Sequence, residues 1–172
     1  MNQQENLDLF NRIVSEYSER LYWHVRDMVG SHDDANDLLQ DIFMKIWSAL
    51  PSYRGDAQLF TWVYRIATNE TLNFLRKKKV RSVLSFESIT AAEERIADDP
   101  YFNGTRAQQV LAAVISKLPA KQRAVFTMRY YDEMKYEDIA EILKTSVGSL
   151  KASYHFAYEK IKEELKKNSV DF

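Results

Sequence analysis

The sequence contains no cysteine, only four glycines and three prolines, and no long apolar run. Without cysteine the chain can hold no disulfide, no thiolate zinc site and no cysteine nucleophile, and we expect a cytoplasmic location. No apolar stretch reaches the ~20 residues needed to span a bilayer, and the N-terminus lacks the basic and apolar segments of a signal peptide. These absences argue against both secretion and membrane insertion.

The chain also lacks an excess of positive charge, since its formal net charge is −1. Proteins that coat nucleic acids by bulk electrostatics usually carry a large positive excess, so any DNA binding here must come from local patches. One such patch is a short cationic run made of Arg76, Lys77, Lys78, Lys79 and Arg81. A run of this kind can equally be a solvated helix end whose cations interact favourably with the helix dipole.

Helical periodicity runs through most of the chain. Few helix-breaking residues, and apolar positions separated by three and four residues, predict helices at about 7–29, 32–50, 58–79, 110–118, 125–130, 136–143 and 147–166. Between 82 and 104 the periodicity weakens and acidic residues gather, as in a linker with room for a short helix. We predict an all-α fold of two small helical domains, 1–81 and 105–172, joined by a linker, 82–104. Two such domains should move relative to one another unless a partner holds them.

The third predicted helix has two different faces. One face is apolar at core spacing, and the other combines an aromatic ring, amides and guanidinium groups, from Trp62, Arg65, Asn69, Asn73 and Arg76. Such a combination suits unpaired bases and phosphates. A single tryptophan on a helix is more often a core residue, so Trp62 and the nearby Tyr64 also have a purely structural interpretation.

The last two predicted helices have the proportions of a helix-turn-helix. Ile139 and Leu143 would form the inner face of the first helix, and Ser146 can cap the second. The residues then left pointing outward, where a recognition helix meets the major groove, are Ser149, Lys151, Ala152, His155 and Phe156. Helical hairpins in ordinary bundles have a similar pattern, so the pattern alone does not distinguish the two.

Six short strings carry a resemblance to a known family. In the first half they are DLLQDIF at 37–43, YRGD at 53–56 and TWVYRIATN at 61–69. In the second half they are LPAKQRAVF at 118–126, YEDIAEIL at 136–143 and SVGSLK at 146–151. Each string alone is weak, but together and in this order they resemble the sigma-70 family, specifically the extracytoplasmic-function (ECF) class that keeps only two helical domains. The resemblance covers nearly the whole chain outside the linker.

The resemblance implies that the first domain binds core RNA polymerase and the minus-ten promoter element. The exposed side of the second helix would dock onto the clamp helices of the largest polymerase subunit through Asp37, Leu38, Gln40, Asp41 and Phe43. The following loop and the third helix would capture a base flipped out of the non-template strand. The residues implied for minus-ten binding are Tyr53, Arg54, Gly55, Asp56, Thr61, Trp62, Tyr64, Arg65, Asn69, Asn73, Arg76, Lys77, Lys78 and Lys79.

The resemblance further implies that the second domain reads the minus-thirty-five element. The implied contacts are Ser146, Ser149, Lys151, Ala152, Ser153, His155 and Phe156. Many relatives carry arginines where this chain has Tyr154, Phe156 and Tyr158, so fewer bidentate guanine contacts are available and readout should rest on Ser149, Lys151, His155 and DNA shape. The resemblance implies an anti-sigma factor that holds the protein inactive, and no cofactor or metal.

Three other classes of protein fit the sequence less well. An enzyme is disfavoured because His24, His32 and His155 lie on separate predicted helices without metal-ligand spacing. A dimeric helix-turn-helix regulator would bind duplex operator DNA by itself with two-fold symmetry, whereas a sigma factor needs core polymerase. A helical adaptor without DNA contacts does not account for a cationic run followed by a recognition helix.

Overall fold

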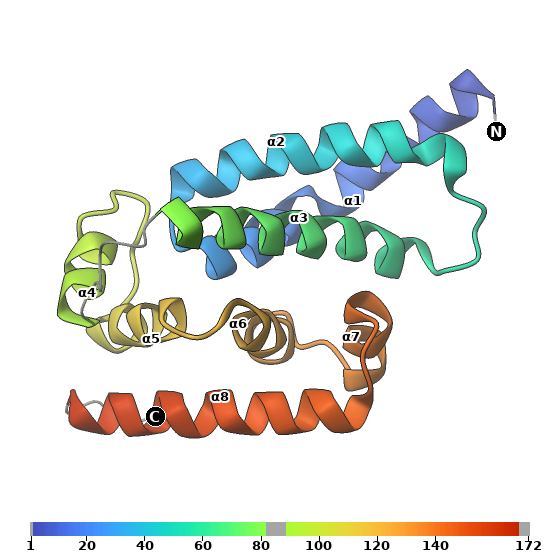
Figure 1. The fold of residues 1–172 in the computed structure, drawn as a ribbon. Coiled ribbons are helices and arrows are strands. Elements are labelled where there is room, and N and C mark those ends of the chain that lie inside the picture. The colour runs from blue at the N-terminus through green and yellow to red at the C-terminus, as the bar shows by residue number, and fades with distance from the viewer. Residues whose placement is uncertain (1, 82–88, 169–172) are drawn as a thin grey trace.

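The computed structural model describes residues 2–81 and 89–168, which form helices and connecting turns without any strand in those ranges. The first half contains α1 (Gln3–Val29), α2 (His32–Ala49), a short 3-10 turn at Leu50–Ser52, and α3 (Leu59–Arg81). The second half contains α5 (Arg106–Ser116), α6 (Ala120–Phe126), a π-helical turn at Thr127–Tyr131, α7 (Tyr136–Leu143) and α8 (Val147–Lys167) (Figure 1). The prediction of an all-α fold with two helical domains is confirmed.

Local sequence signals set the helix ends. The Ser31 side chain accepts a hydrogen bond from the Asp34 amide at the start of α2, and Ser146 does the same for the Ser149 amide at the start of α8. Gly30 ends α1 in the left-handed conformation, with φ 76°, and its amide donates to the Arg26 carbonyl. Caps of this kind satisfy backbone groups that the helix itself leaves without partners, which explains why the predicted ends agree with the structure.

Gly30→Ala should destabilise the protein by about 1 kcal/mol, because an L side chain is strained at this positive φ. Space is not the limitation, since a Cβ at this position would approach only the Arg95 guanidinium, at 3.9 Å. Thermal unfolding of the variant beside the wild type measures the effect. The control is the opposite exchange, Ala49→Gly, at the last residue of α2. An unchanged melting temperature in Gly30→Ala would show that α1 does not end in the left-handed conformation at Gly30.

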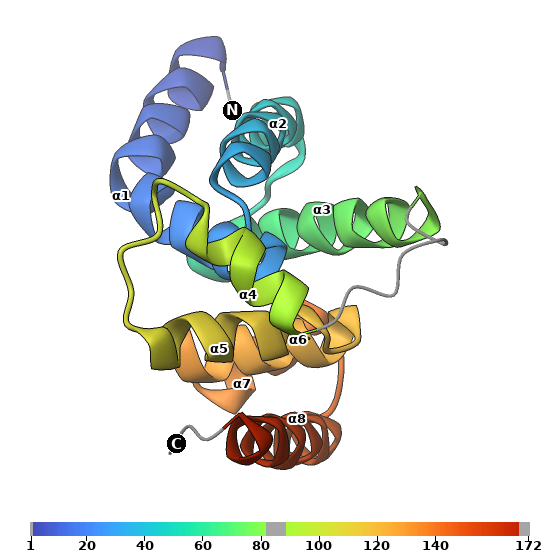
Figure 2. The same ribbon diagram turned by 90° about the vertical axis from the view of Figure 1, so that its left-hand side faces the viewer.

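The segment between the two halves contains a helix of its own. The short helix α4 (Ile89–Ala97) packs against α5, and its buried residues Ala92 and Ile96 form a small cluster with Ala113. Figure 2 shows α4 lying between the end of α1 and α5. An ion pair between Arg26 of α1 and Asp99, at 2.5 Å, ties the chain after α4 to the first half. The short helix allowed for in the linker is therefore present and packed, while residues 82–88 lie outside the described range.

The two halves pack together around one hydrophobic core. Helix α3 lies between α2 and the pair α6 and α7 (Figure 1), and buried residues of the first half, such as Val63, join Met128 and Ile139 of the second half in a single cluster. A further cluster between α5, α6 and α8, around Phe126, belongs to the second half alone. The expectation that the halves move freely without a partner differs from this structure. The reason is that each half carries an apolar face that becomes buried only against the other.

Buried polar contacts also cross between the halves. The His24 side chain on α1 is completely buried, with Nδ1 2.6 Å from the Asp132 carboxylate and Nε2 3.0 Å from the Thr68 hydroxyl. The Arg123 guanidinium of α6 donates to the Met28 carbonyl of α1 at 2.9 Å. These groups are desolvated, so losing a partner would leave a costly unpaired polar group and the packing of the halves depends on their pairing.

A pH dependence follows from Asp27, which faces Asp132 at the same junction. Burial, and then the charge of Asp132, raises the pKa of Asp27 to about 7, although His24 and Arg26 oppose the shift. Because this pKa lies above the unfolded value of about 3.9, the folded chain binds the extra proton, and stability falls as pH rises from about 4 through 7.

Asp27→Asn should therefore remove part of this dependence and stabilise the protein at pH 8 by roughly 2 kcal/mol. Chemical denaturation of both proteins between pH 5 and 8 measures the difference. The two stability curves should approach one another at pH 5, where the Asp27 carboxyl is protonated in the folded state. Parallel curves over the whole range would contradict a raised pKa at Asp27.

Candidate nucleic-acid and polymerase interfaces

The outer side of α2 carries a polar surface. Asp37, Gln40 and Asp41 are exposed there, while Ile42 and Ile46 on the opposite side are completely buried. Across the described ranges of the chain, none of the three polar side chains has a hydrogen-bond or ion-pair partner. An acidic and amide surface that is not needed inside the fold is available to a basic partner.

Two of the residues expected in this surface lie elsewhere. Leu38 is only 6% exposed and belongs to the hydrophobic core, so its place in an outer binding surface is corrected. Phe43 is half-buried and packs edge-on against Phe10 of α1. Both follow from helix geometry, because Leu38 lies one turn before the buried Ile42, and Phe43 lies one turn after Leu39, which packs against the core.

Sequence reasoning missed two exposed apolar side chains that extend the polar surface. Met44 is 69% exposed and Trp47 is 40% exposed, although large hydrophobic side chains are usually buried. Met44 lies one helical turn after Gln40, and Trp47 lies two turns after it. The spacing itself was the available signal, since it places them on the side of α2 that carries Asp37 and Gln40 rather than on the core side.

The loop after α2 is shaped by Tyr53 and Gly55. The Tyr53 hydroxyl donates to the Ala57 carbonyl at 2.9 Å, and its ring lies 4.8 Å from the Trp62 ring of α3. Gly55 adopts a left-handed conformation with φ 78°, with nothing within 4 Å of a built Cβ, and Arg54 and Asp56 are exposed. The loop therefore offers a glycine backbone open to close approach beside a pair of partly exposed aromatic rings.

Two residues expected on the DNA side of α3 are core residues. Tyr64 is 1% exposed, with its ring 5.3 Å from His24 and 4.5 Å from Phe60, and Thr61 is 2% exposed. The physical reason is their position on the helix, because Tyr64 and Thr61 turn toward α1 while Trp62 stays half-buried at the loop. Their expected DNA contacts are corrected. The structural interpretation holds for Tyr64 but only in part for Trp62.

The remaining amides of α3 line a hollow of about 430 Å³ between α2 and α3. Asn69 is exposed, Asn73 is half-buried, and Arg76 donates to the Asn73 side-chain oxygen at 3.3 Å. On the α2 side the hollow begins at Lys45, which pairs with Glu70. The hollow thus combines amide donors and acceptors with a guanidinium at its rim, a chemistry that fits a base edge and a phosphate.

Arg65 does not face this hollow. Its guanidinium donates to the Glu141 carbonyl of α7 at 2.9 Å and is half-buried between the two halves. In this conformation Arg65 joins the halves and is not presented to DNA.

The cationic run forms the end of α3. Arg76, Lys77, Lys78 and Lys79 are all exposed. Lys78 is partly neutralised, because its ammonium lies 2.8 Å from the Asp34 carboxylate. The side chain of Arg81 lies outside the described part. Exposed cations at the end of the helix that lines the hollow have the charge that binds phosphate groups.

Helices α7 and α8 form the helix-turn-helix. Lys144, with φ 51°, makes the left-handed turn between them, and Ile139 and Leu150 form the buried inner side. The Lys151 ammonium lies 5.8 Å from the centre of the Tyr136 ring. The residues predicted from the pattern to point outward are exposed, namely Ser149, Lys151, Ala152, His155 and Phe156. Of the two further residues that the resemblance implied, Ser146 is exposed and Ser153 is half-buried.

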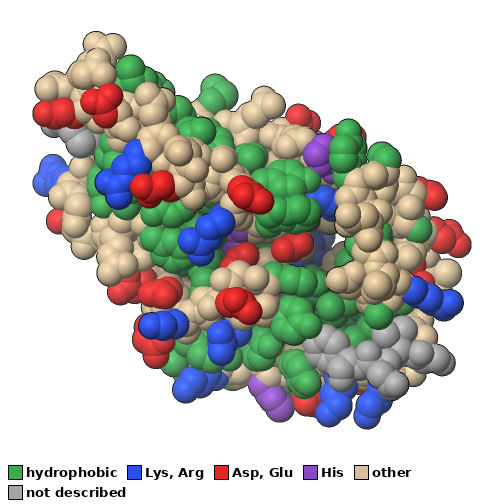
Figure 3. Space-filling model, turned by 180° about the vertical axis from the view of Figure 1, so that it is seen from behind, with side chains coloured by type: hydrophobic (Ala, Val, Ile, Leu, Met, Phe, Trp, Pro, Cys, Tyr) green, Lys and Arg blue, Asp and Glu red, His purple; other side chains and the backbone are tan. Residues whose placement is uncertain are grey.

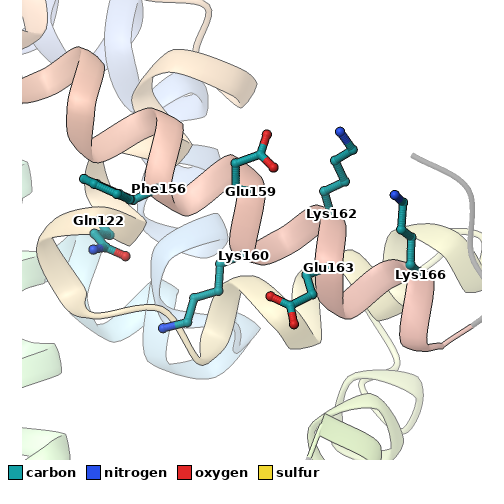
Figure 4. Close-up of a pocket in the computed structure, with 7 residues that line it drawn as sticks. All are labelled: Gln122, Phe156, Glu159, Lys160, Lys162, Glu163 and Lys166. Atoms are coloured by element: carbon teal, nitrogen blue, oxygen red, sulfur yellow. The ribbon is translucent and has the colours of Figure 1, made fainter.

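Beyond Phe156 the outer side of α8 carries charges of both signs. A shallow hollow of about 580 Å³ between Gln122 and α8 is lined by Phe156 and then by Glu159, Lys160, Lys162, Glu163 and Lys166 (Figure 4). Alternating charges neutralise one another, so this part of α8 does not form a concentrated anion site. The first two turns of α8 are therefore the part suited to base contacts.

Comparison with known proteins decides the family. The model of Sigma-70 region 2 matches residues 13–81, and the model of Sigma-70, region 4 matches residues 108–161. The ECF RNA polymerase sigma factor SigW of Bacillus subtilis is 30% identical over 168 residues, covering 92% of this chain and 90% of its own length. This chain belongs to the ECF sigma factors of the sigma-70 family. The ECF RNA polymerase sigma-E factor of Escherichia coli is 32% identical over 161 residues, covering 88% of this chain and 84% of its own length.

Two solved structures share the fold of this ECF sigma factor. The sigma factor RpoE of Bartonella quintana, in complex with the anti-sigma factor NepR, superposes with a TM-score of 0.72 at 25% identity, covering 91% of this chain and 96% of the other. CnrH, in complex with the cytosolic domain of CnrY, has a TM-score of 0.68 at 23% identity, covering 92% of this chain and 88% of the other. Region 2 of the present ECF sigma factor thus corresponds to α1–α3, and region 4 to α5–α8.

None of the helices in the described ranges of this ECF sigma factor is long and apolar enough to cross a membrane.

Proposed function

We propose that this ECF sigma factor acts in the cytoplasm, binds core RNA polymerase through α2 and directs it to promoters, without catalysing a reaction itself. Residues 1–81 form the polymerase-binding and minus-ten domain, 82–104 the linker, and 105–172 the minus-thirty-five domain. One observation carries the proposal. The unpaired acidic surface of α2 and the amide-lined hollow of α3 are neighbours, since the hollow begins at Lys45, one helical turn after Asp41.

The division of labour follows from the chemistry of each surface. Asp37, Gln40 and Asp41 would contact the polymerase, with Met44 and Trp47 adding buried apolar area at the rim of that contact. Tyr53 and Asn69 would hold an unpaired base of the minus-ten element. The first turns of α8, with Ser149, Lys151 and His155, would enter the major groove at the minus-thirty-five element.

An anti-sigma factor is the regulatory partner that we propose. The sigma factor RpoE, which shares this fold, is in complex with the anti-sigma factor NepR, and CnrH is in complex with the cytosolic domain of CnrY. The exposed aromatic residues Trp23, Tyr130 and Tyr131 lie on contacting elements, α1 and the π-helical turn, from opposite halves. Figure 3 shows hydrophobic side chains gathered over the middle of the face on the α1 side, where such a partner could bury them.

The test is co-purification of the chain with core RNA polymerase, followed by in vitro transcription from promoters selected by the reconstituted holoenzyme. We expect binding to core and promoter-dependent initiation. A protein that ignores core but binds a symmetric duplex operator by itself would instead be a conventional helix-turn-helix regulator.

A further inference from the structure

The compact arrangement of the two halves cannot be the arrangement that reads a promoter. Elements centred near minus ten and minus thirty-five are about 25 base pairs apart, which at 3.4 Å per base pair is roughly 85 Å. A compact chain of 172 residues has a radius of gyration of about 16 Å and a diameter of roughly 40 Å. Resting on the proposed function, this mismatch means that the halves must separate before both elements are bound.

The packed halves also withdraw part of the minus-ten surface. Helix α7 packs against α3, and the Glu141 carbonyl takes the Arg65 guanidinium away from the DNA side. The Arg65 Nε is buried there without an acceptor, so this contact leaves one polar group unpaired.

We propose that this conformation is a self-inhibited closed state, held by a latch in which region 4 supplies Asp132 and Arg123 to His24 and the Met28 carbonyl of region 2. Asp132 is suited to this role because it lies just after the π-helical turn, with only 9% of its side chain exposed. His24 is held from behind by Thr68, so its imidazole is fixed in the direction of Asp132. The latch is polar, and water or a partner can replace its hydrogen bonds once the halves part.

The closed state offers core polymerase only the α2 surface, whereas the open state offers both halves, so core binds the open form more tightly and the closed population lowers the apparent affinity. Asp132→Arg would remove the carboxylate that His24 Nδ1 contacts and force a longer side chain into a position that is only 9% exposed, and should therefore shift the chain toward the open state. Asp132→Asn keeps the shape and an acceptor for His24, so it should stay closed.

Spin-label distances in the full chain test this, because the sequence has no cysteine to interfere with labelling. Labels are attached at Glu19→Cys on α1 and Glu159→Cys on α8, two exposed positions in opposite halves. We expect one narrow, short distance in the parent and in Asp132→Asn, and a longer, broader distribution in Asp132→Arg. Leu165→Ala, which weakens only the core of region 4, is the control for general destabilisation and should keep the short distance.

Affinity for core RNA polymerase is measured on the same unlabelled proteins. Asp132→Arg should bind about tenfold more tightly than the parent, and Asp132→Asn should match the parent. An unchanged distance in Asp132→Arg, or a longer distance without tighter binding, would overturn the latch. No core binding by any of the proteins, with the distances still responding, would overturn the proposed function and with it the inhibitory role. Circular dichroism confirms that Asp132→Arg keeps its helices.

Discussion

Asn69→Ala and Tyr53→Ala should each lower open-complex formation roughly tenfold or more, because a base-stacking or base-edge contact contributes about 1–3 kcal/mol. Asn69 is exposed at the hollow between α2 and α3, where its amide can both donate to and accept from a base edge. The Tyr53 ring, 4.8 Å from Trp62, extends an aromatic surface onto which an extruded base can stack. Permanganate reactivity of unpaired thymines on a promoter measures opening directly.

The structure supplies a matched control for the tyrosine. Tyr53→Phe keeps the ring and removes only the hydroxyl that donates to the Ala57 carbonyl, so it should retain most of the opening activity. Recruitment of both alanine variants to duplex promoter through region 4 should survive in a binding assay on the same DNA. Normal opening by both alanine variants would assign melting to other residues.

Asp41→Lys should weaken binding to core RNA polymerase at least tenfold while leaving the fold intact. Asp41 is exposed and has no partner across the described ranges of the chain, so reversal of its charge costs little within the fold. At a complementary interface the same change replaces an attraction by a repulsion. Removing one partner of a buried charge pair there already weakens binding by about 2–5 kcal/mol, and reversing the charge should weaken it at least as much. Titration of labelled core with the purified variant measures the affinity.

Glu19→Lys is the matched control for this reversal, because Glu19 is an exposed carboxylate on α1, outside the α2 surface. It changes the net charge by the same amount and should bind core as the wild type does. Equal affinity of Asp41→Lys and the wild type for core would remove α2 from the polymerase interface. A loss in both variants would point to long-range charge and not to a specific contact.

The closed state and the interfaces together give a physical order of events. The α2 surface is accessible in the closed state, so polymerase can make its first contact before the halves separate. Arg65 becomes available only afterwards, because it is bonded to Glu141 of α7 until then. Since a ligand shifts an equilibrium only by its differential affinity, core must bind the open form more tightly in order to open the chain.

The sequence by itself determined that the chain is helical and where a cap ends a helix, whereas α5 and α6 begin at Arg106 and Ala120, earlier than the apolar spacing indicated. Ser31, Ser146 and Gly30 act on backbone groups within a few residues of themselves, so their effects are local and readable without the fold. The three- and four-residue spacing also placed Asp37, Gln40 and Asp41 on the exposed side of α2, although it missed Met44 and Trp47, and the ordered motifs identified the family. The positions of α8 that the spacing predicted to point outward are exposed in the structure.

Only the tertiary structure decided which aromatic and polar residues are buried. Tyr64 sits beside Trp62 and Arg65 in a string that resembles a DNA-binding motif, yet it packs against His24 and Phe60. Spacing along a helix gives the direction of a side chain but does not say which other helix packs against that side. Helix α3 has neighbours on two sides, α1 and α2 on one and α6 and α7 on the other.

The packing of the halves was likewise beyond the sequence. His24 and Asp132 are separated by 108 positions, and neither belongs to a motif or has a neighbour that signals the other. An acidic, weakly periodic linker predicted separate domains, because local composition reports how a segment behaves alone. What holds the halves together is the apolar surface that each buries on the other, and the energy of that contact depends on complementarity between two surfaces that exist only after both have folded.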